Sequence, residues 1–270
     1  MRYPRRVSSI LGWLVATGIG CALFAWPFFA PGASVAAIAA LAFGTFSALV
    51  LIEMGSRSLD VRSFALLAAL SSIDAAARAL LVTGIGGFSP IFLLILCAGY
   101  IFGAKYGFLV GASSLLVSAV VTGGIGPWLP YQLFAAGWVG AFAGLFADHR
   151  GHRPSWRDIA ILAVIGVIAG YGFGIAMDIW DWTYYQSAPG LGFHAGMRLS
   201  LALSHFARFY VTTSFAWDSL RAGGNALMVI VLGAPVLIVL GRLKAQMSAR
   251  IDRTSLGTGS PAQGGMPSQG

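Results

Sequence analysis

The sequence predicts an all-α integral membrane protein of about eight spans, with both termini on the cytoplasmic side. Of its 270 residues, 57% are hydrophobic and only 10% are charged, whereas a soluble domain carries about 25% charged residues. Apolar runs near the roughly 17–25 residues of a helical span recur along the chain. The basic residues gather in alternate connections between these runs, which predicts how the chain is oriented.

The runs divide the chain into three parts. Residues 1–56 form a transmembrane hairpin of two runs with almost no polar residues inside it, and residues 57–246 form a core of six. The expected spans are Ile10–Ala30, Ser34–Ile52, Ser63–Gly84, Phe88–Ala104, Tyr106–Thr122, Leu133–Ala147, Ile159–Met177 and Gly223–Gly241. Residues 247–270, rich in Gly, Ser, Pro and Gln, predict a disordered cytoplasmic tail.

The net charge of +8 follows membrane topology rather than nucleic-acid binding. With the N-terminus inside, most Lys and Arg residues fall in cytoplasmic segments. The first three outer connections, around Pro31, Gly86 and Gly124, hold none, and the longer fourth one holds Arg198 and Arg208. This asymmetry is the positive-inside rule, and we therefore expect no nucleic-acid partner.

The third run, Ser63–Gly84, combines small residues with two charges. Asp74 and Arg78 are spaced i, i+4 with the acid first, which predicts an intramembrane ion pair. Small residues three and four apart allow another helix to approach closely, from the same bundle or from a partner subunit. The small residues on the ridge nearly opposite the charges are Ala65, Ala69, Ser72, Ala76 and Ala79.

Glycines recur every fourth residue through GYIFGAKYGFLVG, at Gly99, Gly103, Gly107 and Gly111. On one helix they would form a helix–helix contact motif. Lys105 marks a short cytoplasmic turn, so the glycines are expected on two helices that meet around it. Gly166, Gly170 and Gly174 form a second small-residue ridge. Both patterns predict close helix packing.

Residues 122–132, TGGIGPWLPYQ, lie between two apolar runs. A turn needs only two or three Gly or Pro residues, and this stretch also carries Trp128, Tyr131 and Gln132. It is either a connector or part of a binding site. On the outer face, Gly and Pro can build a non-helical cap over a cavity.

The fourth outer connection, roughly residues 178–220, is long. It opens with DIWDWTYYQ, whose aromatic residues suit either a membrane-interface belt or a ligand pocket. Asp178, Asp181 and Gln186 favour the pocket, because ligand sites combine apolar walls with a few polar groups. Further on, Arg198, His205 and Arg208 share one helical face, which predicts an amphipathic helix along the membrane surface.

Motifs for several enzyme classes are missing from the sequence. It has no G-x-x-x-x-G-K-[ST] loop for nucleotide phosphates, no H-E-x-x-H, and no His residues at metal-ligand spacing. Cys21 and Cys97 fall within expected spans, so neither predicts a disulfide or a metal site. We therefore expect no enzyme activity, no metal and no cofactor. The pattern favours a binding subunit that takes its energy from partner proteins.

Residues 89–145, from SPIFLLILCAGYIFGAKYGF to GAFAGL, resemble the S component, the substrate-specific subunit of energy-coupling factor (ECF) transporters. WDSLRAGGNA at 217–226 resembles the start of the last span in its cobalamin-type branch. The resemblance covers roughly residues 60–245. It implies a six-helix S-component core in the bacterial cytoplasmic (plasma) membrane, partnered by a membrane T subunit and two cytoplasmic ATPase subunits. The N-terminal hairpin departs from that six-span pattern.

The resemblance also implies which residues contact ligand and partner. The implied substrate-binding residues are Phe88, Ser89, Trp128, Tyr131, Gln132, Asp178, Trp180, Trp182, Trp217 and Asn225. An Ala-x-x-x-Ala motif on the first core helix is implied to dock the T subunit, and both Ala65/Ala69 and Ala75/Ala79 match it. The ligand is expected to be a vitamin; cobalamin is favoured, and riboflavin or another vitamin is the alternative.

Two alternatives of other classes stay open. A membrane scaffold protein without a small ligand would not need Trp128 or Gln132. A membrane enzyme acting on lipids would need a catalytic cluster around Asp74, Arg78 or His205.

Overall fold

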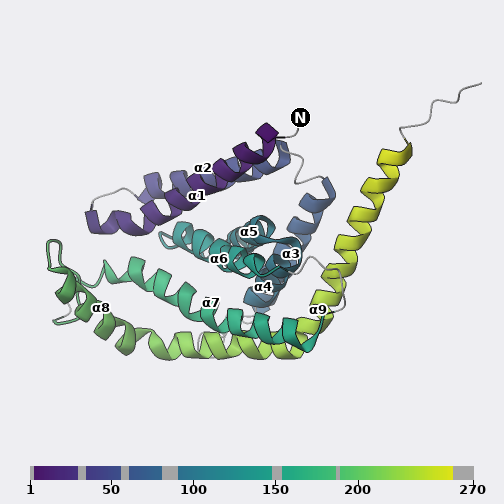
Figure 1. The fold of residues 1–270 in the computed structure, drawn as a ribbon. Coiled ribbons are helices and arrows are strands. Elements are labelled where there is room, and N and C mark those ends of the chain that lie inside the picture. The colour runs from purple at the N-terminus through teal and green to yellow at the C-terminus, as the bar shows by residue number, and fades with distance from the viewer. Residues whose placement is uncertain are drawn as a thin grey trace, which may run out of the picture.

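The computed structural model describes residues 3–29, 35–55, 61–80, 91–147, 154–186 and 189–257. These residues form helices and their connections, without a strand among them (Figure 1). The helices are α1 (Tyr3–Phe29), α2 (Val35–Gly55), α3 (Val61–Leu80), α4 (Ile91–Phe102), α5 (Ala104–Thr122), α6 (Leu129–Leu145), α7 (Trp156–Trp182), α8 (Leu199–Thr213) and α9 (Phe215–Gly257). The all-α prediction is confirmed.

Three of the described helices are long and apolar enough to cross a membrane: α5, α7 and the Phe215–Met247 part of α9. Trp13–Phe29 of α1 and Ile91–Phe102 of α4 are apolar but shorter. Each of the eight expected spans overlaps a helix, and α8 forms where the amphipathic stretch was expected. The structure is therefore that of a helical protein with membrane-spanning character.

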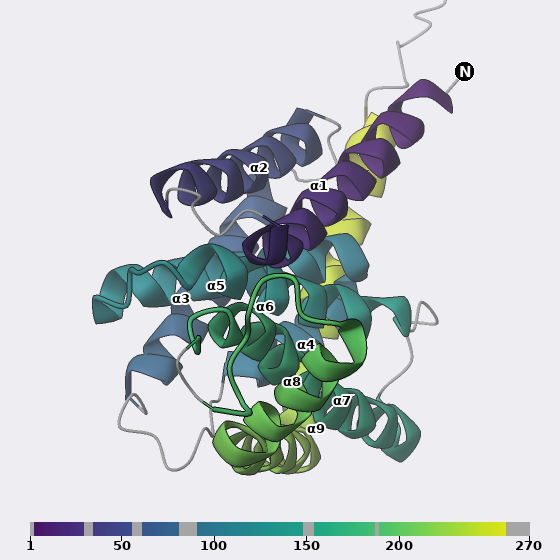
Figure 2. The ribbon, with the colours of Figure 1, turned by 90° about the vertical axis from the view of Figure 1, so that its left-hand side faces the viewer.

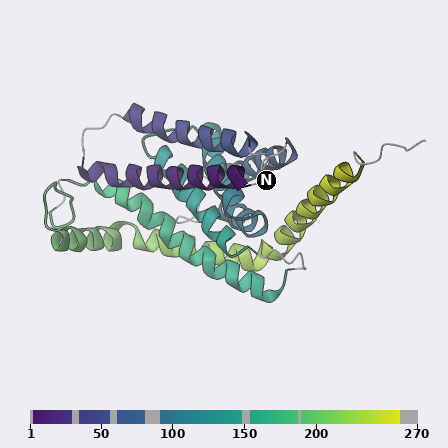
Figure 3. The same cartoon turned by 45° about the horizontal axis from the view of Figure 1, so that its top comes forward.

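The helices pack as a bundle with a hairpin on one side. α5 and α6 lie at its centre, and α7 and α9 run side by side along one face (Figure 1). The α1–α2 hairpin lies on the side opposite the green first half of α9 (Figure 3), whereas the yellow second half of α9 rises behind α1 in Figure 2. The hairpin also contacts α6 and α7. The buried apolar residues form one hydrophobic core, to which α4, α5 and α6 contribute most members.

Glycines bring α4, α5 and α6 into close contact, as their spacing predicted. Gly103 separates α4 from α5 with a φ of 95°, a left-handed conformation that favours glycine. A Cβ on Gly107 would collide with the backbone carbonyl of Gly140, and a Cβ on Gly140 would collide with that of Gly107. Because both residues lack side chains, the backbones of α5 and α6 touch.

The second glycine ridge packs α7 on α9. A Cβ on Gly170 would lie 2.7 Å from Cα of Ala222, and Gly174 leaves the space that the carboxylate of Asp218 occupies. α9 bends along its length (Figure 1) and contains Pro235. A proline inside a helix removes one backbone hydrogen bond and kinks it, which accounts for a bend of this kind.

Three expected boundaries are wrong. α7 continues through Trp182, so DIWDW is helical rather than the start of a loop, because these residues pack on neighbouring aromatic rings. α9 begins at Phe215, and the outer connection is correspondingly shorter. α9 also extends to Gly257, so residues 247–257 of the expected disordered tail are helical.

Candidate ligand pocket

A pocket of about 290 Å³ opens between the start of α6 and the end of α7. Four residues that the sequence predicted to bind substrate come together around it, although two of them lie almost fifty positions from the other two. The lining residues are Trp128, Gln132, Met177, Asp178, Trp180 and Asp181. Its volume is near the lower end of the roughly 300–1,000 Å³ typical of ligand sites.

The loop before α6 positions Trp128. Gly123 ends α5 in a left-handed conformation with a φ of 68°, so the chain can reverse. The indole Nε1 of Trp128 donates a hydrogen bond to the Gly124 carbonyl oxygen at 3.1 Å. The indole ring lies directly over Gly126, where a Cβ would collide with it. The glycines of TGGIGPW therefore hold a tryptophan at the pocket rim.

Tyr131 and Gln132 belong to the first turn of α6, which begins at Leu129 with Pro130 next to it. A non-helical cap can therefore include only the first part of TGGIGPWLPYQ, because α6 begins at Leu129. Gln132 lines the pocket. Tyr131 is buried behind it, with its ring 5.4 Å from the ring of Trp180.

An aromatic side chain of the N-terminal hairpin, Phe24, packs against the far side of Tyr131. Phe24 of α1 meets Tyr131 edge-on, with ring centroids 5.1 Å apart, and lies 5.6 Å from the ring of Trp138. Tyr131 therefore sits between Phe24 and Trp180 and supports the pocket wall from behind. Phe24 lies in a uniformly apolar run, so no sequence signal distinguished it.

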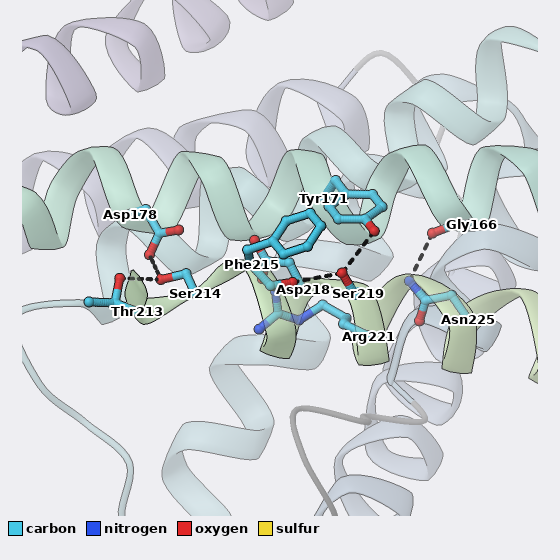
Figure 4. Close-up of polar contacts among 10 residues, drawn as sticks. All are labelled: Gly166, Tyr171, Asp178, Thr213, Ser214, Phe215, Asp218, Ser219, Arg221 and Asn225. Carbon is cyan, nitrogen blue, oxygen red and sulfur yellow. Dashed lines mark hydrogen bonds and ion pairs between the residues drawn. The ribbon is translucent and has the colours of Figure 1, made fainter. Parts of the chain in front are cut away.

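Asp178 is held in place by the junction of α8 and α9 (Figure 4). Ser214 Oγ donates a hydrogen bond to Asp178 Oδ1 at 2.7 Å. The second oxygen, Oδ2, is buried and has no hydrogen-bond partner among the described residues. Nearby, burial and the charge of Asp218 raise the pKa of the Tyr210 phenol to about 12, so this hydroxyl stays protonated at neutral pH.

A polar cluster follows Asp178 along the α7–α9 interface (Figure 4). Arg221 pairs with Asp218 one turn earlier on α9, and its guanidinium lies 5.5 Å from the centre of the Phe173 ring. Tyr171 and Ser219 are joined by a hydrogen bond of 2.9 Å. Asp218 and Arg221 had no predicted role, although their i, i+3 spacing is a possible ion-pair signal.

Four predicted binding residues do not line the pocket. The Trp182 Nε1 donates to the Leu191 carbonyl oxygen at 2.6 Å, and its ring packs on Phe28, Phe193 and Phe206. Trp217 is 52% exposed in the first turn of α9. Asn225 is buried and donates to the Gly166 carbonyl oxygen at 3.0 Å, across the α7–α9 contact. Tyr131, as described, lies behind the wall.

Phe88 and Ser89 fall outside the described residues. Met177 lines the pocket without having been singled out, because one methionine in an apolar helix carries no signal. Asp181 lines it as well, and its place in the acidic and aromatic stretch DIWDW was the signal that indicated it.

The two Ala-x-x-x-Ala pairs of α3 face different ways. Ala65 and Ala69 are both exposed, whereas Ala75 is only 1% exposed and packs inside the bundle. Ala79 is half-buried. Of the two pairs, only Ala65 and Ala69 present an open face.

The expected direct ion pair on α3 is not formed. Arg78 donates instead to Ser118 Oγ on α5, at 3.2 Å. Asp74 is fully buried, and neither carboxylate oxygen has a hydrogen-bond partner among the described residues. Asp74 and Arg78 therefore interact only by the attraction between their charges, without a direct contact.

The pocket and the basic residue Arg157 lie at opposite ends of α7. Arg157 is exposed in the first turn, and the pocket residues Asp178 and Asp181 are near the last. At about 1.5 Å per residue the separation is about 30 Å, close to the thickness of a bilayer core. At the basic end, Lys244 of α9 donates to the Ile101 carbonyl oxygen near the end of α4.

Comparison of the chain with known protein families, curated proteins and solved structures found no significant match. The pocket itself therefore carries the functional argument. Two tryptophan rings, two carboxylates, an amide and a thioether can enclose an organic ligand and orient it by hydrogen bonds.

Proposed function

We propose that this chain is the substrate-binding membrane subunit of an ECF-type ABC importer for a vitamin or related micronutrient. One observation carries the proposal: Trp128 and Gln132 from the start of α6 meet Asp178 and Trp180 from the end of α7 around one pocket. These are positions that the resemblance to S components implied. The proposed topology has eight spans in the bacterial cytoplasmic membrane, with both termini inside and the pocket on the outer face.

The size of the pocket bears on the ligand. A volume of about 290 Å³ suits a vitamin of one or two rings. A corrinoid is several times larger, and most of it would extend beyond these walls. The pocket therefore favours a smaller vitamin over cobalamin.

Binding to the purified protein tests this function. We expect at least one vitamin in a panel to bind with micromolar affinity or better, about −8 kcal/mol, measured by titration calorimetry. Trp128→Ala should weaken that binding at least tenfold, because it removes one wall. Trp217→Ala is the matched control, since this tryptophan is exposed outside the pocket. If no vitamin binds, or if Trp128→Ala has no effect, the proposal fails.

The partner subunit can be tested separately. The open face of α3 at Ala65 and Ala69 is the proposed T-subunit contact, because small residues let a second helix approach. Ala69→Leu should reduce co-purification of a co-expressed T subunit. Ala160→Leu, on an exposed position of α7, should leave it unchanged. Equal recovery with both variants would refute this docking face.

A further inference from the structure

The pocket is acidic, and among the described residues no basic side chain lines it. Its charged residues are Asp178 and Asp181, and the remaining lining residues are Trp128, Gln132, Met177 and Trp180. Arg221, in the adjoining polar cluster, is already paired with Asp218. A ligand that enters the pocket therefore meets negative charge.

Some carboxylate oxygens of the pocket accept no hydrogen bond from the described residues. Asp178 is only 8% exposed, Ser214 satisfies its Oδ1, and its Oδ2 has no partner among the described residues. The Asp181 side chain makes no hydrogen bond or ion pair within the described part of the chain, although it is partly buried. Unpaired carboxylates in such surroundings are costly. A ligand that supplies a positive charge or N–H donors would compensate for that cost.

The aromatic walls favour the same kind of ligand. Trp128 is 39% exposed and uses its N–H on the Gly124 carbonyl, so what it offers to a ligand is its ring. Trp180 is held between the rings of Tyr131 and Tyr184, at 5.4 and 5.2 Å. Tryptophan faces attract cations more strongly than other aromatic rings do. They also stack on flat ligands.

We infer that the pocket binds a small aromatic cation, whose ring packs on Trp128 and Trp180 while its charge faces Asp178 and Asp181. The Gln132 amide is placed to bond a polar substituent of the ring. Ligands with phosphate or carboxylate groups in the pocket are disfavoured, because like charges at short range repel. This inference rests on the proposed function, since it names the substrate class of the same site.

The test uses three probes that share one ring and differ in charge: the cation 1-methylnicotinamide, neutral nicotinamide and anionic nicotinate. Binding to the full-length protein in lipid nanodiscs is measured by titration calorimetry or saturation-transfer NMR. We expect the cation to bind at least tenfold more tightly than the neutral amide, and the anion not to bind. Asp181→Asn should reduce cation affinity at least tenfold and remove most of the preference for the cation over nicotinamide, while Asp181→Glu, which keeps the charge, should retain most of both.

The outcomes separate this inference from the proposed function. If a neutral or anionic vitamin binds with an affinity that depends on Trp128 while the cation does not bind, the substrate class is wrong and the binding function stands. If both Asp181→Asn and Trp128→Ala bind the cation as tightly as the unaltered protein does, the cation binds outside the pocket and the inference is overturned. If neither these probes nor any vitamin binds, both proposals fail.

Discussion

The carboxylate of Asp178 shows how single residues shape the pocket. It is buried at the end of an apolar helix, where an unpaired charge is expensive, and Ser214 at the α8–α9 junction supplies its hydrogen bond. The same bond ties α7 to that junction. Ser214 is therefore a positioning residue for the pocket, although it does not line it.

Ser214→Ala should lower the free energy of unfolding by about 1–3 kcal/mol, because it leaves a buried acceptor without its donor. Thermal unfolding of the purified variant in detergent measures this. Ser200→Ala is the matched control, since Ser200 is exposed on α8 and should unfold like the unaltered protein. Equal stability of the two variants would show that the bond contributes nothing.

At the scale of elements, backbone contact between helices adds to side-chain packing. Gly107 of α5 and Gly140 of α6 face each other so closely that neither tolerates a Cβ. Between membrane helices, where the hydrophobic effect adds little, such contacts supply much of the association. α5 and α6 meet along this seam, and the loop that joins them carries Trp128.

Gly140→Ala should destabilise the bundle by at least about 1–3 kcal/mol, because the added methyl group overpacks a backbone contact. Gly172→Ala provides the control, since a Cβ on this α7 glycine meets no atom within 4 Å. Size-exclusion profiles and thermal unfolding compare the two. A Gly140→Ala protein as stable as the control would contradict the close packing of α5 and α6.

The α1–α2 hairpin contacts the pocket end of the bundle through aromatic side chains. Phe24 reaches the pocket wall through Tyr131, and Phe28 packs on Phe193 at 5.0 Å. The α1–α2 hairpin therefore braces the end of the bundle where the pocket opens. A substitution at Phe24 would act on the pocket wall through the neighbouring rings of Tyr131 and Trp180.

At the scale of the whole molecule, the pocket lining and the opposite end differ in chemistry. The lining is aromatic and acidic, with Arg198 at the N-cap of α8 and Arg208 on α8 exposed at the same end, and the opposite end exposes Lys105 and Arg157. Basic residues are retained on the cytoplasmic side of membrane proteins, so the pocket end is expected to face outward.

Cysteine labelling tests this orientation. In a Cys21→Ala background, with Cys97 buried, Tyr184→Cys should react with a membrane-impermeant maleimide in intact cells. Arg157→Cys should react only after permeabilisation. The reverse pattern would overturn the orientation and place the pocket on the cytoplasmic side.

Much of this fold could be predicted from sequence because its signals are local. Apolar runs predicted where helices form, and Lys105 predicted a turn between α4 and α5, which the structure has two residues earlier at Gly103. Charged and aromatic residues indicated both segments that border the pocket. Helix ends were less predictable, since α7 and α9 extend past the points where hydrophobicity falls.

What the sequence by itself determined is therefore the helical, membrane-type architecture and a set of residue types suited to a ligand site. Only the tertiary structure decided which of them share the pocket. Trp128 and Asp178 meet there, while Trp182 and Asn225 form hydrogen bonds inside the protein. The physical reason is that the direction of a side chain depends on how its helix is rotated against neighbours distant in sequence, which no local pattern records.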